Sequence, residues 1–196
     1  MFLLKPNRLQ VSVGFWLLLA WFWRANGIGL LLTVLGAAAV HEAGHWVALR
    51  CLGGEVRRLQ LNVFGAVMET DSRRLTYGQE VLALLAGPAA NFLGAAIAAG
   101  FRLAEARVFL GANLVLCLFN LLPIRPLDGG RVLELLVSRC WGDGAGEQAT
   151  RVVSLCFSLL LCLFLCGLMG VTGGSLWLLP AAAGFGMAAW RETIGK

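Results

Sequence analysis

The short segment "HEAGH", residues 41–45, holds three side chains whose spacing can do chemistry. On a helix, residues four apart project from the same face, so His41 and His45 can place an imidazole nitrogen on one metal ion. Glu42 is rotated off that axis but stays near enough to hold a metal-bound water. Two imidazoles suit zinc, which brings the pKa of a bound water close to neutrality, and Glu42 can then accept its proton.

The same segment lies inside an apolar run, and its histidines are the only two in the chain. Ionisable residues at membrane depth are costly to bury and are usually functional. A different interpretation is that the three polar side chains only join helices to one another. The lack of other histidines and the HExxH spacing favour a metal site.

A mononuclear catalytic zinc usually has a third protein ligand, which here must be a carboxylate or a thiolate. Asp128 stands out because prolines at 123 and 126 break the helix before it, and two glycines after it let the chain bend back. An ordinary Asp-Gly turn, with Asp128 as a helix N-cap, is the alternative interpretation. The other candidates are Glu134, Glu80, Glu69, Glu55 and the six cysteines.

The composition is that of a polytopic membrane protein. Of 196 residues, 59% are hydrophobic and only 14% are charged, with a mean hydropathy of +0.78. The net charge of +5 is spread in short clusters between apolar runs, which argues against nucleic-acid binding. The cysteines lie mostly in the apolar runs, as small hydrophobic residues do. We read residues 1–23 as a membrane segment and not as a cleaved signal peptide. Six transmembrane helices are predicted at about 11–23, 28–49, 81–101, 108–122, 152–170 and 175–190.

The positive charges predict an orientation. With the N-terminus in the cytoplasm, thirteen of the sixteen Lys and Arg residues fall on the cytoplasmic side. Both termini are then cytoplasmic. His41 and His45 lie in the cytoplasmic half of the second span, and the fourth span brings Asp128 to the same side. The three side chains should therefore meet at a similar depth, in a site that opens to the cytoplasm.

Two of the predicted cytoplasmic segments are longer than turns. Partial alternation over Val56–Met68 predicts a short β-hairpin at the membrane surface, with Gly65 at its turn. Its edge could pair with an extended substrate at Leu61 and Val63, or the hairpin could only cap the site. After Asp128 we expect an amphipathic helix to about Arg139, followed by a glycine-rich loop.

Three motifs together, "HEAGH", "AGPAANFL" (86–93) and "FNLLPIRPLDGGR" (119–131), resemble the site-2 protease family of intramembrane zinc metalloproteases. The stage IV sporulation protein FB group, with six spans, is the most similar. The resemblance implies a three-helix catalytic core, zinc held by His41, His45 and Asp128, and Glu42 as the catalytic base. It also implies that Asn120 orients the substrate or stabilises the oxyanion. Asn91 matches a GPxxN motif and either packs helices or acts directly.

The resulting expectation is one all-α membrane domain, 1–196, with its catalytic core at about 28–139 and accessory spans at 11–23, 152–170 and 175–190. It would hydrolyse a peptide bond in or near a transmembrane segment of a membrane-protein substrate in the lipid bilayer. A regulator or a second copy of the chain is left open as a further partner. We see no segment long enough for a PDZ insertion and no CBS domain, which argues against nucleotide regulation.

A membrane zinc sensor or transporter is the main alternative function, and an inactive protease that serves as a scaffold is the second. Transporters usually spread polar residues through their spans along a path, whereas here these residues converge on one place. Simple metal binding gives Glu42 no role, and the intact set of four residues argues against a scaffold.

Overall fold

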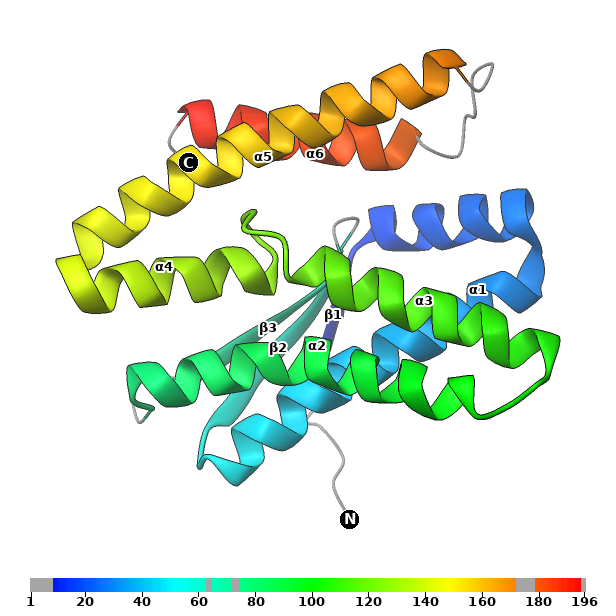
Figure 1. Ribbon diagram of the computed structural model, residues 1–196, viewed down its shortest axis with the longest axis horizontal. Coiled ribbons are helices and arrows are strands. Elements are labelled where there is room, and N and C mark those ends of the chain that lie inside the picture. Colours follow the sequence, from blue (N-terminus) through cyan, green and yellow to red (C-terminus); the bar gives the residue numbers. More distant parts are fainter. Residues whose placement is uncertain (1–8, 63–64, 72–74, 172–178, 195–196) are drawn as a thin grey trace. The chain divides into compact units, whose positions relative to one another are not determined.

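The computed structural model describes residues 9–62, 65–71, 75–171 and 179–194. The described chain is mostly helical and divides into two units, 1–119 and 120–196. The first unit holds three strands and helices α1, α2 and α3. The second unit holds α4, α5 and α6 (Figure 1).

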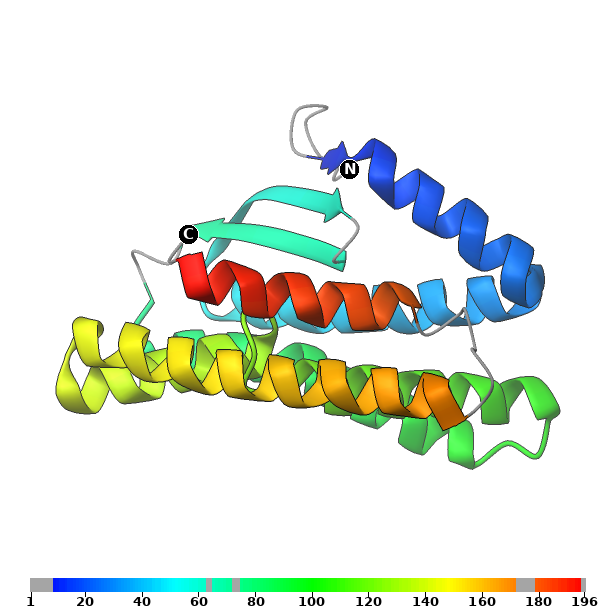
Figure 2. The ribbon, with the colours of Figure 1, turned by 90° about the horizontal axis from the view of Figure 1, so that it is seen from above.

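The first helix, α1 (Val13–Cys51), combines the first two predicted spans. Its N-cap is Ser12, whose Oγ accepts a hydrogen bond from the Phe15 N–H at 3.2 Å. Gly27 has φ 83°, a conformation that glycine adopts without strain, and the helix kinks there. Figures 1 and 2 show the sharp turn between the dark and light blue halves. The predicted boundary between the two runs is therefore this kink.

The third and fourth predicted spans are α2 (Tyr77–Ala99) and α3 (Ala104–Asn120). Thr76 and Gln79 form a capping box at the start of α2. The described helices α2 and α3 run side by side with the second half of α1 (Figure 1). The candidate metal-binding histidines are on α1, so α2 and α3 are the helices that surround them.

Three short strands form one sheet in the order β1–β2–β3. The strand pair expected over Val56–Met68 corresponds to β2 (Glu55–Asn62) and β3 (Gly65–Asp71), which are antiparallel. Residues 63–64 between them lie outside the described residues. The sequence did not predict β1 (Leu9–Val11), which pairs parallel to β2 with Val11 opposite Leu61. Three residues are too few to show a period of two.

In the second unit, α4 (Asp128–Trp141) is followed after a single residue by α5 (Asp143–Val171). The predicted glycine-rich loop after Arg139 is therefore wrong. Only Gly142, with φ 88°, breaks the helices. Gly146 lies inside α5, where an added Cβ would fall on the Ser138 Oγ and lie 2.8 Å from the Glu134 carbonyl oxygen. Gly146 is therefore a site of close packing between α4 and α5 and not part of a loop.

The last helix, α6 (Leu179–Ile194), lies beside α5 in both ribbon views (Figures 1 and 2). It overlaps the sixth predicted run, 175–190, whose start lies in residues 172–178, outside the described residues. Arg151 on α5 donates to the Glu192 and Thr193 carbonyl oxygens at 2.6 and 3.3 Å. These bonds tie the ends of the two helices together.

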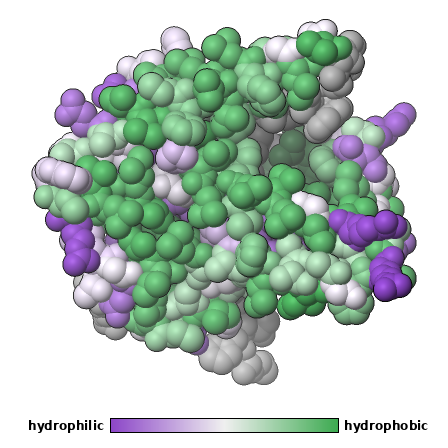
Figure 3. Space-filling view, in the orientation of Figure 1, coloured by the Kyte–Doolittle hydropathy of each residue, from purple (hydrophilic) through white to green (hydrophobic). Residues whose placement is uncertain are grey.

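Three described helices, α1, α2 and α5, are long and apolar enough to cross a membrane. Apolar side chains cover most of the face in Figure 3, and the hydrophilic ones gather at its margins. Most of the largest fully buried side chains are polar, which is the reverse of a soluble core. They are Asn91, Asn113, Thr150, Ser154 and Ser158. A surface of this kind is solvated by lipid, and the chain is a multi-pass membrane protein.

Candidate metal centre

The two histidines of "HEAGH" lie one turn apart on α1, and both are buried, with 6% and 9% of their surface exposed. Their rings are nearly perpendicular, at 84°. The two Nε2 atoms face each other at 3.0 Å. The predicted convergence of the imidazoles on one face of the helix is therefore present.

The other nitrogen of each ring has a partner on α2 that can only accept. His45 Nδ1 lies 2.8 Å from the Ala83 carbonyl oxygen, and His41 Nδ1 lies 2.6 Å from the Asn91 Oδ1. The Asn91 amide is oriented by its Nδ2, which donates to the Ala37 carbonyl oxygen at 2.9 Å. Both rings must therefore carry their proton on Nδ1.

When both rings are neutral, each Nε2 therefore presents a lone pair, and the two Nε2 atoms face each other at 3.0 Å. Two neutral rings in this tautomer cannot form a hydrogen bond between their Nε2 atoms. A cation placed before both nitrogens, a proton or a metal ion, removes the repulsion between the two lone pairs. Metal-bound histidines typically donate their other N–H to a carbonyl or amide oxygen in this way. The residues present thus fit a metal ion.

Helix α2 can lie this close because glycine occupies the position against the histidines. A Cβ built on Gly87 would fall on the His45 ring, and one built on Gly44 of α1 would lie 2.7 Å from the Ala90 Cβ. Ala83, Gly87 and Asn91 follow one another at intervals of four, so they share a face of α2. The motif "AGPAANFL" did not by itself predict that this face of α2 packs against the histidines. The spacing of four residues between Ala83, Gly87 and Asn91 could have indicated it.

Asp128 is the first residue of α4, and Leu127 holds the N-cap position without a side-chain capping bond. The interpretation of Asp128 as an ordinary N-cap is therefore wrong. The two following glycines fit tightly against the preceding loop: a Cβ on Gly129 would overlap the Leu121 carbonyl, and one on Gly130 would lie 2.6 Å from the Ile124 carbonyl. Ile124 is itself 1% exposed. The "LDGG" segment is thus packed in one conformation.

Glu134, another candidate third ligand, is paired instead with Arg125. The Arg125 Nη2 and Nε lie 2.8 and 3.1 Å from its Oε2. Arg125 also faces the Glu192 carboxylate at 3.9 Å and donates its backbone N–H to the Ser154 Oγ at 3.1 Å. These bonds hold the loop before Asp128. Among the described residues, the two imidazoles and the Asp128 carboxylate form the set that could hold a metal ion.

The remaining predicted site residues lie as follows. Glu42 is half-buried on α1, next to His41. Asn120 is the last residue of α3 and is half-buried. Leu61 lies on the central strand β2, with Val11 on one side and Ala66 on the other, so it is not at a free edge of the sheet. Val63 lies outside the described residues.

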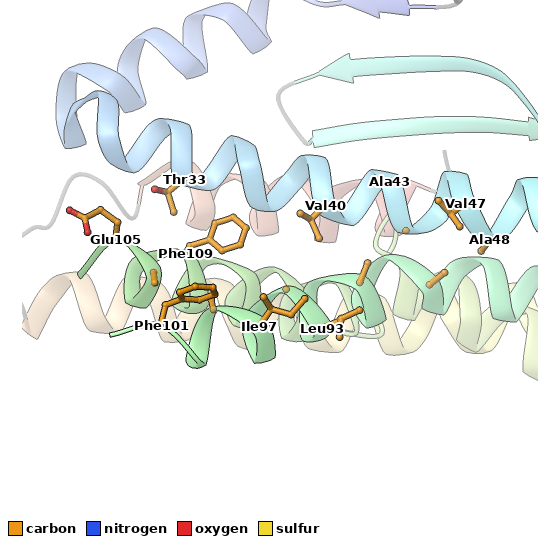
Figure 4. Close-up of a pocket in the computed structure, with 16 residues that line it drawn as sticks. Thr33, Val40, Ala43, Val47, Ala48, Leu93, Ile97, Phe101, Glu105 and Phe109 are labelled. Carbon is orange, nitrogen blue, oxygen red and sulfur yellow. The ribbon is translucent and has the colours of Figure 1, made fainter. Parts of the chain in front are cut away.

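Beside the histidines, an apolar groove of about 940 Å³ runs between α1, α2 and α3 (Figure 4). Val40, Val47, Leu93, Ile97 and Phe109 point into it. Glu105, at one end, is the only charged side chain among the lining residues. A surface like this suits lipid chains or another apolar segment within a membrane.

Comparison with known proteins supports the same family that the motifs indicate. Residues 102–165 match the sequence profile of Peptidase family M50, a range that includes Asn120 and Asp128 but not "HEAGH". Stage IV sporulation protein FB of Bacillus subtilis is 29% identical over 163 residues, which cover 79% of this chain and 56% of that protein. Rip3 of Mycobacterium tuberculosis is 36% identical over 185 residues, covering 85% of this chain and 44% of that protein. The chain spans about half the length of these curated relatives.

The fold agrees as well. The structure of the site-2 protease from Methanocaldococcus jannaschii matches with a TM-score of 0.71 over 98% of this chain and 94% of that chain, at 21% identity. At that identity the match concerns the fold alone. Motifs, family profile and fold agree, and they confirm the resemblance of this chain to the site-2 proteases of peptidase family M50.

Proposed function

We propose that this chain is an intramembrane zinc metalloprotease that hydrolyses a peptide bond in or beside a transmembrane segment of a membrane protein. The single observation that carries the proposal is the pair of buried histidines whose Nε2 atoms face each other at 3.0 Å. Hydrogen bonds to α2 fix this arrangement from behind. Two neutral histidines held in this way present two donor nitrogens to one cation.

The metal ligands in this proposal are His41, His45 and Asp128. Two imidazoles and one carboxylate are a catalytic zinc set that leaves a fourth position open. Bound zinc would supply a Lewis acid that polarises the scissile carbonyl and acidifies a water. The rigid packing of "LDGG" supports a ligand role for Asp128, because a first-turn carboxylate held this firmly loses little entropy on binding.

The proton transfers fall to Glu42, next to His41 on the same helix. It accepts a proton from the attacking water and gives it to the leaving amine. Asn120 ends α3, eight residues before Asp128, and its amide would orient the substrate or donate to the oxyanion.

Six membrane spans are part of the proposal. They are the two halves of α1 on either side of Gly27, together with α2, α3, α5 and α6. The positive charges favour cytoplasmic termini and a site that opens to the cytoplasm.

A substrate must be extended to be cleaved, and a sheet edge offers it backbone partners. Because β2 is central, we place this pairing on β3, whose second edge has no strand partner among the described residues. Successive N–H groups of a strand point to opposite sides. Of the two variants Val67→Pro and Met68→Pro, one therefore removes an N–H that bonds to β2, and the other removes an N–H that points outward to the second edge. Unequal effects on cleavage, with equal expression, are expected. Equal and undiminished cleavage would refute the pairing.

The function is tested by Glu42→Gln in the full chain, co-expressed with a candidate membrane-protein substrate. The variant should keep its zinc and lose cleavage, because it alters the proton acceptor and leaves the imidazoles in place. Cleavage that persists in the variant would refute the mechanism. A wild-type chain that binds zinc, cleaves nothing and changes zinc flux across vesicles would instead support a transporter.

A further inference from the structure

A buried chain of two amides connects α3 to the first histidine of the metal centre. Asn113 on α3 and Asn91 on α2 are both fully buried, at 0% exposed. The Asn91 Nδ2 donates to the Asn113 Oδ1 at 2.8 Å, and the Asn91 Oδ1 lies 2.6 Å from the His41 Nδ1. No sequence motif singled out Asn113.

The orientation of each amide is fixed by a backbone carbonyl, which can only accept. The Asn113 Nδ2 donates to the Phe109 carbonyl oxygen at 2.9 Å, so its Oδ1 must face α2. The two hydrogens of the Asn91 Nδ2 then go to the Ala37 carbonyl and to the Asn113 Oδ1. Only the oxygen of Asn91 is left for His41, and that oxygen requires a proton on Nδ1.

The packing of α2 against α3 provides room for this contact. A Cβ built on Gly94 would lie 3.0 Å from the Asn113 Oδ1, tighter than nine in ten real contacts of a Cβ atom. Gly94 is three residues beyond Asn91 on the same helix, so it borders the same seam. A larger residue there would push the Asn113 amide away from Asn91.

We infer that Asn113 is a positioning residue of the metal centre: it holds the Asn91 amide so that His41 keeps the tautomer that offers Nε2 to the metal. The inference rests on the proposed zinc site and adds a residue that touches neither metal nor substrate. Without Asn113, one hydrogen of the Asn91 amide is buried without an acceptor, and the amide and the ring would move to satisfy it. Buried partners of this kind typically contribute a factor of about 10–100 to metal affinity.

The test is the zinc affinity of the full chain, purified in detergent and measured by competition with a chelator. Asn113→Leu keeps the approximate size and removes both hydrogen bonds, and we expect affinity to fall about tenfold. Asn113→Asp should restore it, because a buried protonated carboxyl can donate to the Phe109 carbonyl and accept from Asn91. Asn91→Leu, which removes the direct bond to His41, should have the larger effect.

Two controls separate positioning from mere packing. Thr150→Val replaces a fully buried polar group on α5 and should leave zinc affinity unchanged. Gly94→Ala keeps both amides but displaces Asn113, so it should weaken zinc binding even where Asn113→Leu fails to fold. Affinity equal to wild type in Gly94→Ala, or in a folded Asn113→Leu, would overturn the inference while leaving the zinc site standing. A wild-type chain that binds no zinc would overturn the zinc site, and the inference with it.

Discussion

Helices α2 and α5 carry the same sequence pattern and put it to different uses. Each has a buried stripe of small or polar residues at every fourth position: 83, 87, 91 and 95 on α2, and 146, 150, 154 and 158 on α5. Such stripes let helices approach closely in a membrane. On α2 the stripe faces two histidines, and its amide and carbonyl oxygens fix their tautomers.

On α5 the same spacing makes only a packing seam. The Thr150 Oγ1 and the Ser158 Oγ have no hydrogen-bond partner in the described part of the chain, and Ser154 accepts one from the Arg125 backbone. Gly146 lies against α4 where a Cβ would not fit. A stripe of this kind therefore predicts that two helices approach closely, while the residues opposite it decide whether they form a functional site.

Removal of a histidine opposite the α2 stripe should have the largest effect of all. His45→Ala takes away one of the two facing nitrogens, and we expect no measurable zinc in the purified chain, because the remaining donors no longer close around an ion. Metal content per chain by elemental analysis checks this. Zinc retained at one ion per chain would mean that the ion is bound elsewhere.

Gly87→Ala should have the next largest effect. The new Cβ would collide with the His45 ring, so the ring or α2 must shift. We expect zinc affinity to fall and unfolding stability to drop by about 1–3 kcal/mol, the usual cost of overpacking. Thermal unfolding in detergent and chelator competition measure the two effects.

Gly78→Ala is the matched control for that variant, since Gly78 is on the same helix and has no heavy atom within 4 Å of its added Cβ. It should leave zinc affinity unchanged and stabilise α2 by up to about 1 kcal/mol through helix propensity. Similar losses in both variants would show that α2 does not support the histidine through Gly87.

On the α5 stripe, Ser154→Ala should cost about 1 kcal/mol of unfolding stability, because the Arg125 N–H loses its acceptor. Zinc affinity should change less than in Gly87→Ala. A larger loss of zinc than of stability would mean that this seam also supports the metal centre. Urea or thermal unfolding, paired with the zinc competition assay, distinguishes these outcomes.

The smallest effect is expected for Thr150→Val, whose hydroxyl has no partner in the described part of the chain. The substitution nearly conserves volume and removes a buried polar group, so stability should be unchanged or slightly higher. A loss of more than about 1 kcal/mol, the usual size of one hydrogen bond, would reveal a bond that the hydroxyl makes.

The sequence could predict the site residues that belong to a recognisable spacing of side chains. HExxH on a helix requires the two imidazoles to meet, and the proline-flanked "LDGG" marked Asp128. The carbonyl of Ala83 could not be predicted, since every residue has a carbonyl and only the approach of α2 selects this one. The role of Asn113 could not be predicted either, because it depends on a contact with Asn91, a residue 22 positions away on another helix.

The fold shows the same division. Apolar runs predicted the helices, but glycines have two meanings that the sequence does not separate. Gly142 breaks a helix with a positive φ, whereas Gly146, four residues on, permits close packing within one. The predicted loop failed on that ambiguity. The sequence did not predict strand β1, because its three residues are a strand through their pairing with β2 and have no pattern of their own.

The most direct test of the central claim is the zinc stoichiometry of the full chain in detergent, compared among wild type, Glu42→Gln and His41→Ala. The facing Nε2 atoms predict one zinc per chain in the wild type and in Glu42→Gln, and none in His41→Ala. A wild-type chain that is folded and takes up no zinc, or a His41→Ala chain that keeps it, would contradict the account.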